Sequence, residues 1–389
     1  MLRFQSLTVT SRRPQRLTCR ACPRIVSKSF ETSIVNIAIG KGPIMTPAVQ
    51  LEALERAATA DPSTGAATRA QLGEVSALLG DVLPALEAAL RRATAGPELL
   101  DEAARNLVLA GGKRVRPMTT LLTAVACGGD ASKALPFAAA AELVHSATLL
   151  HDDVIDEGEE RRGRPASRVL FGNLVSVLAG DLLLTRAIEL VDTAAVPDVM
   201  RDLLATLQAL IAGEVAQMMA RHREDLGMDG YLGIVQGKTA SLFGFACRAG
   251  ARSAGAAPER VASIGRMGEH VGIAFQVVDD VLDLDGDPER VGKRLGADLA
   301  EGKTTLPLAF ALAEDASRLR ILLPAARIGD LDAARAVASL PVVRRGCARA
   351  REYAGGRSSS ALFELERLPP TRARALLEQL VHELVGRRT

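Results

Sequence analysis

From Met45 to the C-terminus, apolar residues recur every three or four positions, and Ala, Leu, Arg and Glu dominate the chain. This spacing places the apolar side chains on one face of an α-helix, and residues 199–219 and 372–385 are clear examples. Alternating runs of Val, Ile, Thr and aromatic residues, typical of β-strands, are nearly absent. Glycine and proline separate the helical segments, so the pattern predicts roughly a dozen helices in an all-α domain.

The most apolar of the expected helices covers residues 136–157, and we expect it to be buried inside a helical bundle. The longest apolar run, at about residues 135–150, is interrupted by Glu142 and His145. We expect no membrane-spanning segment, because a helical span needs about 20 predominantly apolar residues. The serine run at 358–360 is expected to form a short polar loop.

Composition excludes several classes of protein. The 389 residues carry 48 Lys and Arg against 46 Asp and Glu, and this near-neutral balance argues against a nucleic-acid partner. A hydrophobic fraction of 48% argues against disorder and supplies a large core. Five cysteines in a chain of this length are no disulfide framework, so we expect a reducing, cytoplasmic location.

Residues 1–44 differ from the rest of the chain. Seven basic residues and no acidic residue precede Glu31, a composition typical of a mitochondrial transit peptide. The alternative is that translation begins at Met45, which would leave the protein in the cytoplasm. The expected organisation is an N-terminal extension, residues 1–44, followed by one domain, residues 45–389.

Two nearly identical acidic clusters end apolar helical segments. The first is Asp152, Asp153 and Asp156, and the second is Asp279, Asp280 and Asp283. On a helix, positions i, i+1 and i+4 fall within an arc of about 100°, so each cluster should present three carboxylates on one face. Such carboxylates repel one another, which raises a pKa unless cations intervene. Oxygen ligands with room for water and phosphate suit Mg²⁺, so we predict both clusters to be magnesium ligands.

Basic residues next to glycine accompany these clusters. Of the five lysines in residues 45–389, four directly follow a glycine, and they are Lys113, Lys238, Lys293 and Lys303. Arg161 and Arg162 lie close after the first cluster. A flexible backbone beside a cation allows close approach to a phosphate, although none of these motifs has the spacing of a nucleotide P-loop. The combination indicates substrates that carry more than one diphosphate between them.

The ordered set of motifs resembles that of the trans-isoprenyl diphosphate synthases, most closely the long-chain polyprenyl synthases that make quinone side chains. From about residue 86 onward, the chain contains GGKRVRP, ELVHSATLLHDDVID, RRGRPA, FGNLVSVLAGDLLLTRA, GKTASLF, FQVVDDVLDLDGD and GKTTLPL in the family's order. The resemblance implies an all-α isoprenoid synthase fold, with about ten core helices around a central apolar cavity. It also implies a homodimer.

The resemblance further implies the reaction. Isopentenyl diphosphate would be condensed repeatedly onto an allylic diphosphate, such as farnesyl or geranylgeranyl diphosphate. The two acidic clusters would hold Mg²⁺ ions, usually three, that bridge the allylic diphosphate. Metal ions and protein cations would stabilise the departing diphosphate, and the allylic cation would then be attacked by the double bond of isopentenyl diphosphate.

The motif matches also assign roles to the cations. Lys238 joins the six aspartates as a catalytic residue. The residues implied to contact the allylic diphosphate are Arg161, Lys238 and Lys293. Those implied to bind isopentenyl diphosphate are Lys113, Arg116, His145 and Arg162. Further substrate-binding residues are Thr239, Gln276 and Lys303.

Product length is expected to depend on residues below the first acidic cluster. Thr148 and Ala147 lie four and five residues before Asp152, one helical turn below it. Short-chain relatives commonly carry a bulky aromatic residue at this level. Because both residues here are small, we expect an open apolar tunnel and an octaprenyl, nonaprenyl or decaprenyl product. Such a product must reach a bilayer, so loose peripheral association with a membrane is expected.

Three rival functions are weighed against this one. A medium-chain synthase that makes geranylgeranyl diphosphate is the nearest. A non-catalytic subunit of a heteromeric prenyl synthase would lose acidic or basic motifs, and this chain keeps both kinds. A terpene cyclase lines its cavity with aromatic residues, whereas aromatic residues make up 3% of this chain.

Overall fold

The computed structural model describes residues 75, 77–110, 114–161, 164–285 and 296–387, and every structural statement below concerns these residues. The expected boundary between residues 1–44 and 45–389 lies outside them. Three predicted phosphate-binding residues, Lys113, Arg162 and Lys293, also lie outside the described residues.

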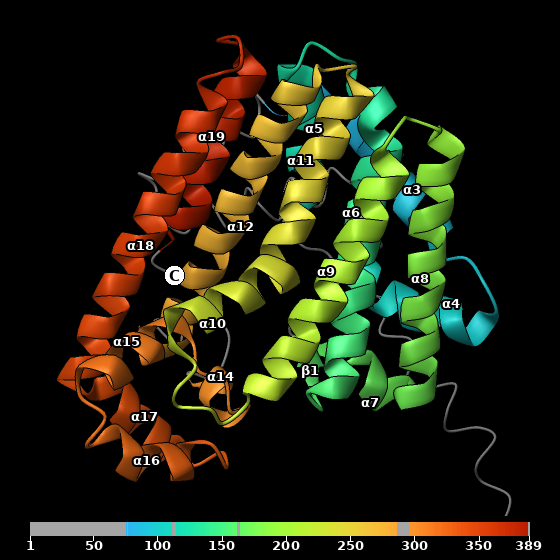
Figure 1. The fold of residues 1–389 in the computed structure, drawn as a ribbon. Helices are drawn as coiled ribbons and strands as arrows, with labels where there is room; N and C mark the ends of the chain where they lie inside the picture. Colours follow the sequence, from blue (N-terminus) through green and yellow to red (C-terminus); the bar gives the residue numbers. More distant parts are fainter. Residues whose placement is uncertain (1–74, 76, 111–113, 162–163, 286–295, 388–389) are drawn as a thin grey trace, which may run out of the picture. The chain divides into compact units, whose positions relative to one another are not determined.

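The described part of the chain is all-α apart from one short hairpin, which confirms the fold class predicted from the apolar spacing (Figure 1). The elements of the first half are α3 (Val82–Ala93), α4 (Glu98–Val108), α5 (Val115–Ala126), α6 (Ala131–Ile155), β1 (Glu160–Arg161), β2 (Arg164–Pro165), α7 (Ser167–Phe171), α8 (Asn173–Ala194) and α9 (Val199–Ala220). Those of the second half are α10 (Gly227–Val235), the π-helical turn η1 (Gln236–Ala240), α11 (Ser241–Ser253), α12 (Pro258–Asp285), α14 (Ala297–Ala300), α15 (Leu306–Glu314), α16 (Leu319–Ala326), α17 (Leu331–Ser339), α18 (Pro341–Leu365) and α19 (Arg372–Val385).

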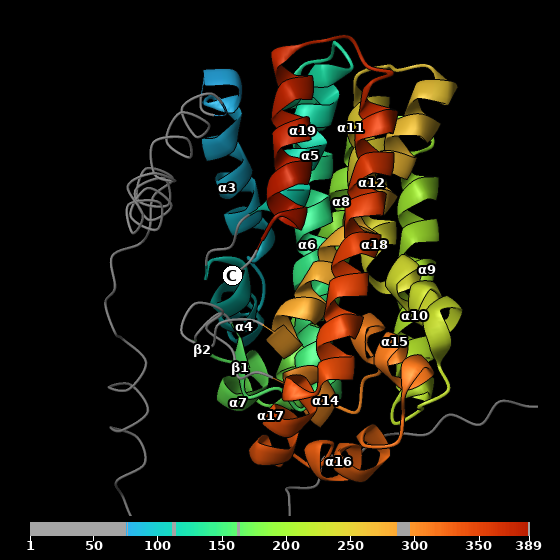
Figure 2. The same ribbon diagram turned by 90° about the vertical axis from the view of Figure 1, so that its left-hand side faces the viewer.

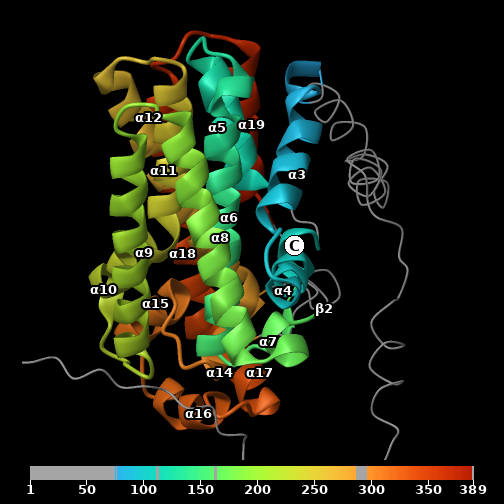
Figure 3. The same cartoon turned by 90° about the vertical axis from the view of Figure 1, so that its right-hand side faces the viewer.

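Two clusters of buried apolar side chains hold the helices together. One joins α5, α6, α8 and α11, and the other joins α12, α15 and α18. Helix α6 packs along α8 and α5, while α12 packs along α11 and α18. Figure 2 shows α14, α16 and α17 gathered at one end of the long helices. Figure 3 shows the side of the bundle on which α8 and α9 lie. The C-terminal ends of α6 and α12 therefore come to the same end of the bundle (Figure 1).

Helix α6 is the buried apolar helix predicted at 136–157. It begins after Asp130, whose carboxylate accepts a hydrogen bond from the backbone N–H of Ser132 at 2.8 Å. Such an N-cap satisfies a backbone donor that has no partner within the helix. Phe137 and Leu143 are fully buried along its length. Helix α6 thus crosses the core and carries the first acidic cluster at its C-terminal end, although α15 and α10 are more apolar along their length.

The prediction of a polar loop at residues 358–360 is wrong, because these serines lie inside α18. The hydroxyl of Ser359 donates to the carbonyl of Gly355 at 3.1 Å, and that of Ser360 donates to the carbonyl of Gly356 at 3.1 Å. Serine hydroxyls that bond to the carbonyl four residues earlier are satisfied within a helix. Packing of α18 against α12 and α15 then outweighs the weak helix propensity of this segment.

Among the described residues, α9 is long and apolar enough to cross a membrane by length and composition alone. Only 28% of its apolar window is buried within the described structure. Its inner face packs against η1 and α11, so the helix belongs to the bundle. Its outer face carries exposed apolar side chains, of which Ile211 and Met219 are 66% and 73% exposed.

Candidate active site

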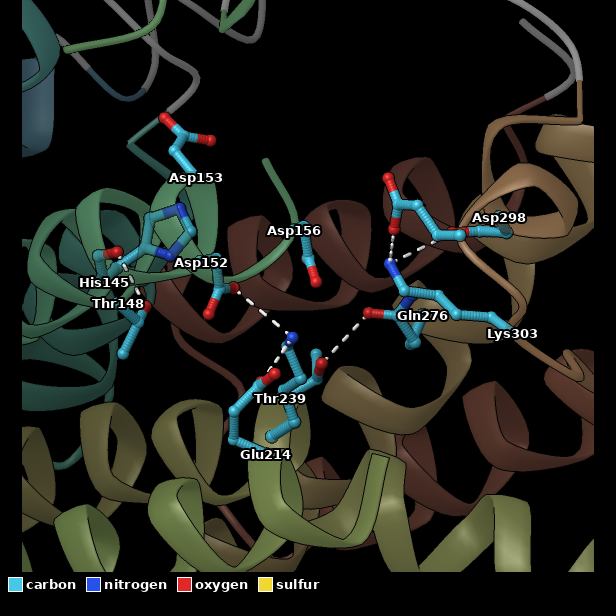
Figure 4. A network of polar contacts seen from close by, with 12 residues as sticks. His145, Thr148, Asp152, Asp153, Asp156, Glu214, Thr239, Gln276, Asp298 and Lys303 are labelled. Carbon is cyan, nitrogen blue, oxygen red and sulfur yellow. Dashed lines mark hydrogen bonds and ion pairs between the residues drawn. The ribbon is translucent and has the colours of Figure 1, made fainter. Parts of the chain in front are cut away.

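A pocket of about 540 Å³ lies where the C-terminal ends of α6 and α12 meet. Five of the six predicted aspartates line it, and they are Asp152, Asp156, Asp279, Asp280 and Asp283. Five other predicted residues line the same pocket, and they are Arg161, Lys238, Thr239, Gln276 and Lys303. Figure 4 shows how residues far apart in sequence face one another across it.

Each acidic cluster lies at the C-terminal end of a helix. Helix α6 ends at Ile155 and α12 ends at Asp285, so the carboxylates of both clusters occupy or directly follow the last turns. A helix C-terminus carries a partial negative charge of about half an elementary charge, which disfavours anions and favours cations. The aspartates therefore need cations, from the protein or from solution, to stay ionised together.

Burial is the main cause of the shifted pKa values in the first cluster. It raises the pKa of Asp152 to about 6, against the opposing effect of Lys238, and Glu214 and Asp156 add to the rise. The pKa of Asp153 is also raised by burial, although Arg161 opposes the shift. Repulsion between carboxylates, the cause expected from the sequence, thus contributes less than the loss of water around them.

The structure separates Asp153 from its two neighbours, contrary to the expectation that all three carboxylates share one face. Asp153 is buried and does not line the pocket; its Oδ1 accepts hydrogen bonds from Arg161 Nη2 at 2.6 Å and Nε at 2.9 Å. Figure 4 shows its carboxylate pointing away from Asp156 and Lys238. Successive residues are about 100° apart on a helix, whereas i and i+4 are about 40° apart, so Asp152 and Asp156 converge and Asp153 does not.

Each carboxylate of the first cluster contacts one protein cation. Asp152 Oδ2 lies 3.3 Å from Lys238 Nζ, Asp153 pairs with Arg161, and Asp156 pairs with Arg221. These cations come from η1, from β1 and from the end of α9. The first cluster is therefore neutralised by side chains from three separate elements.

Lys238 is positioned by close contact between two backbones. A Cβ atom at Gly213 would lie 2.5 Å from the backbone N of Lys238, and one at Gly237 would lie 2.9 Å from the Cα of Gly213. Only glycines permit α9 and η1 to approach this closely. Lys238 Nζ consequently lies 2.5 Å from Glu214 Oε2, on the turn of α9 beside Gly213 (Figure 4). The π-helical geometry of η1 is itself a feature often found at functional sites.

A chain of hydrogen bonds holds Asp280 in the second cluster. The Thr239 hydroxyl donates to Gln276 Oε1 at 2.9 Å, and Gln276 Nε2 donates to Asp280 Oδ1 at 2.9 Å. The Tyr231 hydroxyl donates to Asp280 Oδ2 at 2.5 Å. Burial and the nearby Asp298 hold the pKa of Asp280 well above its usual range, although these hydrogen bonds oppose the shift.

Backbone groups and a C-terminal arginine hold the other two carboxylates of the second cluster. The two oxygens of Asp283 accept hydrogen bonds from the N–H groups of Ala297 at 3.1 Å and Asp298 at 3.2 Å. Asp279 Oδ1 lies 3.0 Å from Arg387 Nη2, and the same guanidinium stacks 4.3 Å above the ring of Phe275. Donors fixed by the fold, together with one arginine, thus orient this cluster.

Lys303 faces the first cluster from the opposite side of the pocket (Figure 4). It pairs with Asp298 Oδ1 at 3.4 Å and with Glu301. Burial alone would lower the pKa of Lys303, but Asp298 and Glu301 raise it above its usual value, with a further contribution from Asp156. Lys303 therefore stays positively charged, and its charge interacts with carboxylates on both sides of the pocket.

Besides Asp153, four predicted residues in the described part of the chain lie outside the lining of this pocket. Arg116 occupies the first turn of α5, with its guanidinium 4.6 Å from the centre of the Phe243 ring. His145 and Thr148 are half-buried on α6, where the Thr148 hydroxyl donates to the His145 carbonyl at 2.8 Å. Ala147 is fully buried in the core.

Several residues of the site were not singled out from the sequence, and they are Glu214, Arg221, Tyr231, Asp298 and Arg387. Two of them carried a usable signal. Tyr231 is one of two tyrosines in the chain, and Glu214 is a lone acid in the apolar second half of α9. The others are ordinary charged residues whose role appears only when loops and termini are folded against the helices.

The donors around the pocket fit a divalent cation. No three carboxylate, histidine or cysteine side chains in the described part of the chain are already arranged around one metal position. The carboxylates that line the pocket from opposite sides are nevertheless the oxygen donors that Mg²⁺ prefers, and the space between them leaves room for a diphosphate. Asp152 and Asp156 from α6, with Asp279 and Asp283 from α12, are the residues placed to hold such ions.

Residues 97–338 match the model of a family described as Polyprenyl synthetase. The nonaprenyl diphosphate synthase of Mycobacterium tuberculosis is 36% identical over 331 residues, which cover 84% of this chain and 95% of that protein. The heptaprenyl diphosphate synthase component 2 of Geobacillus stearothermophilus is 36% identical over 316 residues, covering 80% and 97%. Among solved structures, the Caulobacter crescentus polyprenyl synthase complexed with calcium and isoprenyl diphosphate is similar with a TM-score of 0.76 at 33% identity, covering 82% and 98%.

Proposed function

The chain belongs to the polyprenyl synthetase family, and we propose that it is a long-chain trans-polyprenyl diphosphate synthase. It is a prenyltransferase that condenses isopentenyl diphosphate onto an allylic diphosphate, for which we propose farnesyl or geranylgeranyl diphosphate. The observation that carries this proposal is the single pocket in which two acidic clusters face each other with Lys238 and Lys303 between them. Such a pocket suits a diphosphate bound through divalent cations and amines.

Members of this family use a divalent metal, and we propose Mg²⁺, with about three ions held by the two clusters around the diphosphate. When bound, these ions supply positive charge that stabilises the diphosphate as it departs. Asp152 and Asp156 would supply metal ligands from one side of the pocket, and Asp279 and Asp283 would supply them from the other. Lys238 Nζ lies 3.3 Å from Asp152 Oδ2, so its ammonium group is beside the carboxylates proposed to hold the metal ions and the diphosphate.

The chemistry then follows from the placement of two substrates. The allylic C–O bond breaks, the diphosphate takes the electron pair, and an allylic cation remains. The double bond of isopentenyl diphosphate forms the new C–C bond, and loss of a proton to the released diphosphate restores a double bond. Because no protein base is needed, the residues act by positioning and by electrostatic stabilisation. Lys238, Lys303 and Arg161 supply donors whose positions the fold already determines.

The small side chains of Ala147 and Thr148, one turn below the first cluster, support a long product. We propose an octaprenyl to decaprenyl chain that serves as a quinone side chain. The long apolar product is delivered to a bilayer, so we propose a cytoplasmic enzyme that associates loosely with membranes, or a mitochondrial matrix enzyme if residues 1–44 act as a transit peptide.

We propose that a second copy of the chain covers the apolar face formed by α7, α8 and α9. This face exposes large apolar side chains, including Leu170, Leu174, Leu178, Leu204, Ile211 and Met219. Apolar surface of this extent on adjacent elements is characteristic of subunit interfaces. Light scattering on the purified chain should give the mass of a homodimer, and a monomer at micromolar concentration would contradict the proposal.

The relative named as a component of a heptaprenyl diphosphate synthase suggests a second candidate, a subunit that works only with a partner. The acidic and basic residues gathered in one pocket favour a chain that is active by itself. The two candidates differ in one simple observation, which is whether the purified chain alone turns over its substrates.

The decisive experiment is mass spectrometry of the product made by the purified full chain. Farnesyl diphosphate, isopentenyl diphosphate and MgCl₂ should give polyprenyl diphosphates of the octaprenyl to decaprenyl class, and excess EDTA should abolish them. A product that stops at geranylgeranyl diphosphate would indicate the medium-chain alternative. No product from the chain alone would favour the heteromeric subunit.

A further inference from the structure

Arg114 is a buried cation that joins three helices and the end of a fourth. It directly precedes α5, has a left-handed backbone with φ 47°, and is only 8% exposed. Its Nε donates to Glu87 Oε1 on α3 at 2.9 Å, and its Nη1 donates to Glu142 Oε1 on α6 at 2.6 Å. Its Nη2 donates to the backbone carbonyl of Val108 at 2.8 Å. An arginine held in a left-handed conformation costs free energy, which these contacts offset.

The charges of this cluster make it sensitive to single substitutions. Burial alone would lower the pKa of Arg114, but Glu142 and Glu87 raise it, so the guanidinium stays charged. Val108 is the last residue of α4, where the partial negative charge of the helix end adds to the attraction. Two carboxylates share one guanidinium, so removal of either leaves a neutral pair. Removal of Arg114 would instead leave the buried carboxylate of Glu142 and the partly exposed carboxylate of Glu87 without their cation.

The two ion pairs of Arg114 lead to different parts of the molecule. Arg116, in the first turn of α5, follows two residues after Arg114. His145 lies three residues after Glu142, and such residues share one face of a helix. The pair with Glu142 therefore joins the two segments that carry Arg116 and His145. The ion pair with Glu87 links Arg114 to α3, which carries no residue of the predicted site.

We propose that Arg114, through its ion pair with Glu142, is a positioning residue that sets Arg116 and His145 at the spacing that binds the diphosphate of isopentenyl diphosphate. This inference rests on the proposed function. Two donors on separate helices bind one diphosphate well only when their separation is held, and a displacement of about 1 Å can cost up to about 100-fold in rate. The link between α5 and α6 holds that separation.

Matched substitutions of the two glutamates separate this role from general stabilisation. Methionine is unbranched, apolar and similar in length to glutamate, so Glu142→Met and Glu87→Met each remove one ion pair and leave a neutral pair behind. Calorimetry without metal or allylic substrate measures the Kd of isopentenyl diphosphate itself. Steady-state kinetics gives KM for both substrates, and thermal melting reports the loss of stability common to both variants.

We expect Glu142→Met to raise the Kd and the KM of isopentenyl diphosphate by about tenfold, with KM for farnesyl diphosphate changed less than about twofold. Glu87→Met should leave all three values within about twofold, although its melting temperature falls as well. Equal effects of the two variants on isopentenyl diphosphate would overturn the positioning role. If the unmodified chain neither binds nor condenses isopentenyl diphosphate, the proposed function itself is wrong.

Arg114→Lys provides a second test should Glu142→Met fail to fold. Lysine keeps the charge but offers a single ammonium group, which cannot hold Glu87, Glu142 and a carbonyl in the fixed geometry of a guanidinium. We expect a selective rise in the Kd of isopentenyl diphosphate for this variant, smaller than that for Glu142→Met. An unchanged Kd would contradict the proposal.

Discussion

The two acidic clusters have nearly the same sequence but are held in different ways. Every carboxylate of the first cluster pairs with a cationic side chain, and the partners are Lys238, Arg161 and Arg221. In the second cluster, Asp280 is held by a tyrosine and a glutamine, Asp283 accepts from two backbone N–H groups, and Asp279 pairs with an arginine. Identical residue spacing therefore leads to two different electrostatic environments.

The residues one helical turn before the two clusters differ as well. One turn below the first cluster lie Ala147 and Thr148, whereas the corresponding positions below the second are Ala274 and Phe275. The Phe275 ring is 5.6 Å from that of Phe243, so aromatic side chains fill this level. The proposed function requires such a difference, with small side chains below the cluster where the product chain is proposed to grow.

The largest effect is expected from removing one carboxylate of either cluster. Asp152→Ala and Asp279→Ala should each lower Mg²⁺-dependent condensation by about 1,000-fold or more, because both sides of the pocket must hold the metal ions. Product formation from labelled isopentenyl diphosphate measures the loss. Exposed Asp332→Ala, on α17, is the control and should be unchanged. Substantial turnover in either site variant would show that its cluster is not a metal site.

The next effect separates cationic partners from neutral hydrogen-bond donors. Lys238→Gln should lower kcat with farnesyl diphosphate by about 100-fold, because it removes a charge from the departing diphosphate. Tyr231→Phe removes one hydrogen bond to Asp280, so we expect a loss of about tenfold or less and a lower melting temperature. Steady-state kinetics of the two variants side by side provides the measurement. A larger loss of kcat for Tyr231→Phe than for Lys238→Gln would contradict the proposed difference between the clusters.

Product length should respond to substitution below the first cluster only. Ala147→Phe should shorten the product to the farnesyl or geranylgeranyl class, because the ring blocks the space into which the chain grows. Phe275→Leu, below the second cluster, should leave the product ladder unchanged. Chromatography of the dephosphorylated products measures both. An unchanged ladder for Ala147→Phe would contradict the position of the tunnel.

The smallest effect concerns stability and pH in the metal-free protein. Burial raises the pKa of Asp152 to about 6, so between pH 4 and pH 6 the folded state binds more protons at this group than the unfolded state does. The contribution of Asp152 to stability therefore falls as pH rises through this window. Asp152→Asn should melt a few degrees higher than the unmodified protein at pH 7.5, with a smaller difference at pH 5.

Saturating MgCl₂ is the control for this pH dependence. Bound cations favour the ionised carboxylate, so the advantage of Asp152→Asn at pH 7.5 should shrink or reverse when the metal is present. Melting curves with and without MgCl₂ at the two pH values provide the comparison. A pH-independent difference without metal would show that Asp152 does not titrate near pH 6.

Much of the fold and part of the site could be predicted because they depend on local spacing. Apolar residues at three- and four-residue intervals indicate the helices of the bundle, and the two similar acidic clusters mark the ends of two of them. The spacing predicts that Asp153 shares a face with Asp152 and Asp156. Asp153 lies at the edge of that arc of about 100°, however, and its carboxylate turns to Arg161 instead. Local propensity predicts a loop at the serines 358–360, but packing outweighs propensity and these residues lie in α18.

By itself, the sequence determined that the chain forms an all-α bundle with two carboxylate clusters and glycine-adjacent lysines. Only the tertiary structure decided which cation meets which carboxylate, because Lys238, Arg221, Tyr231 and Arg387 reach the pocket through contacts between elements distant in the chain. Helix periodicity is a local property of the backbone. The pairing of charges depends on how close two backbones come, as at Gly213 and Gly237, and that distance exists only once the helices have packed.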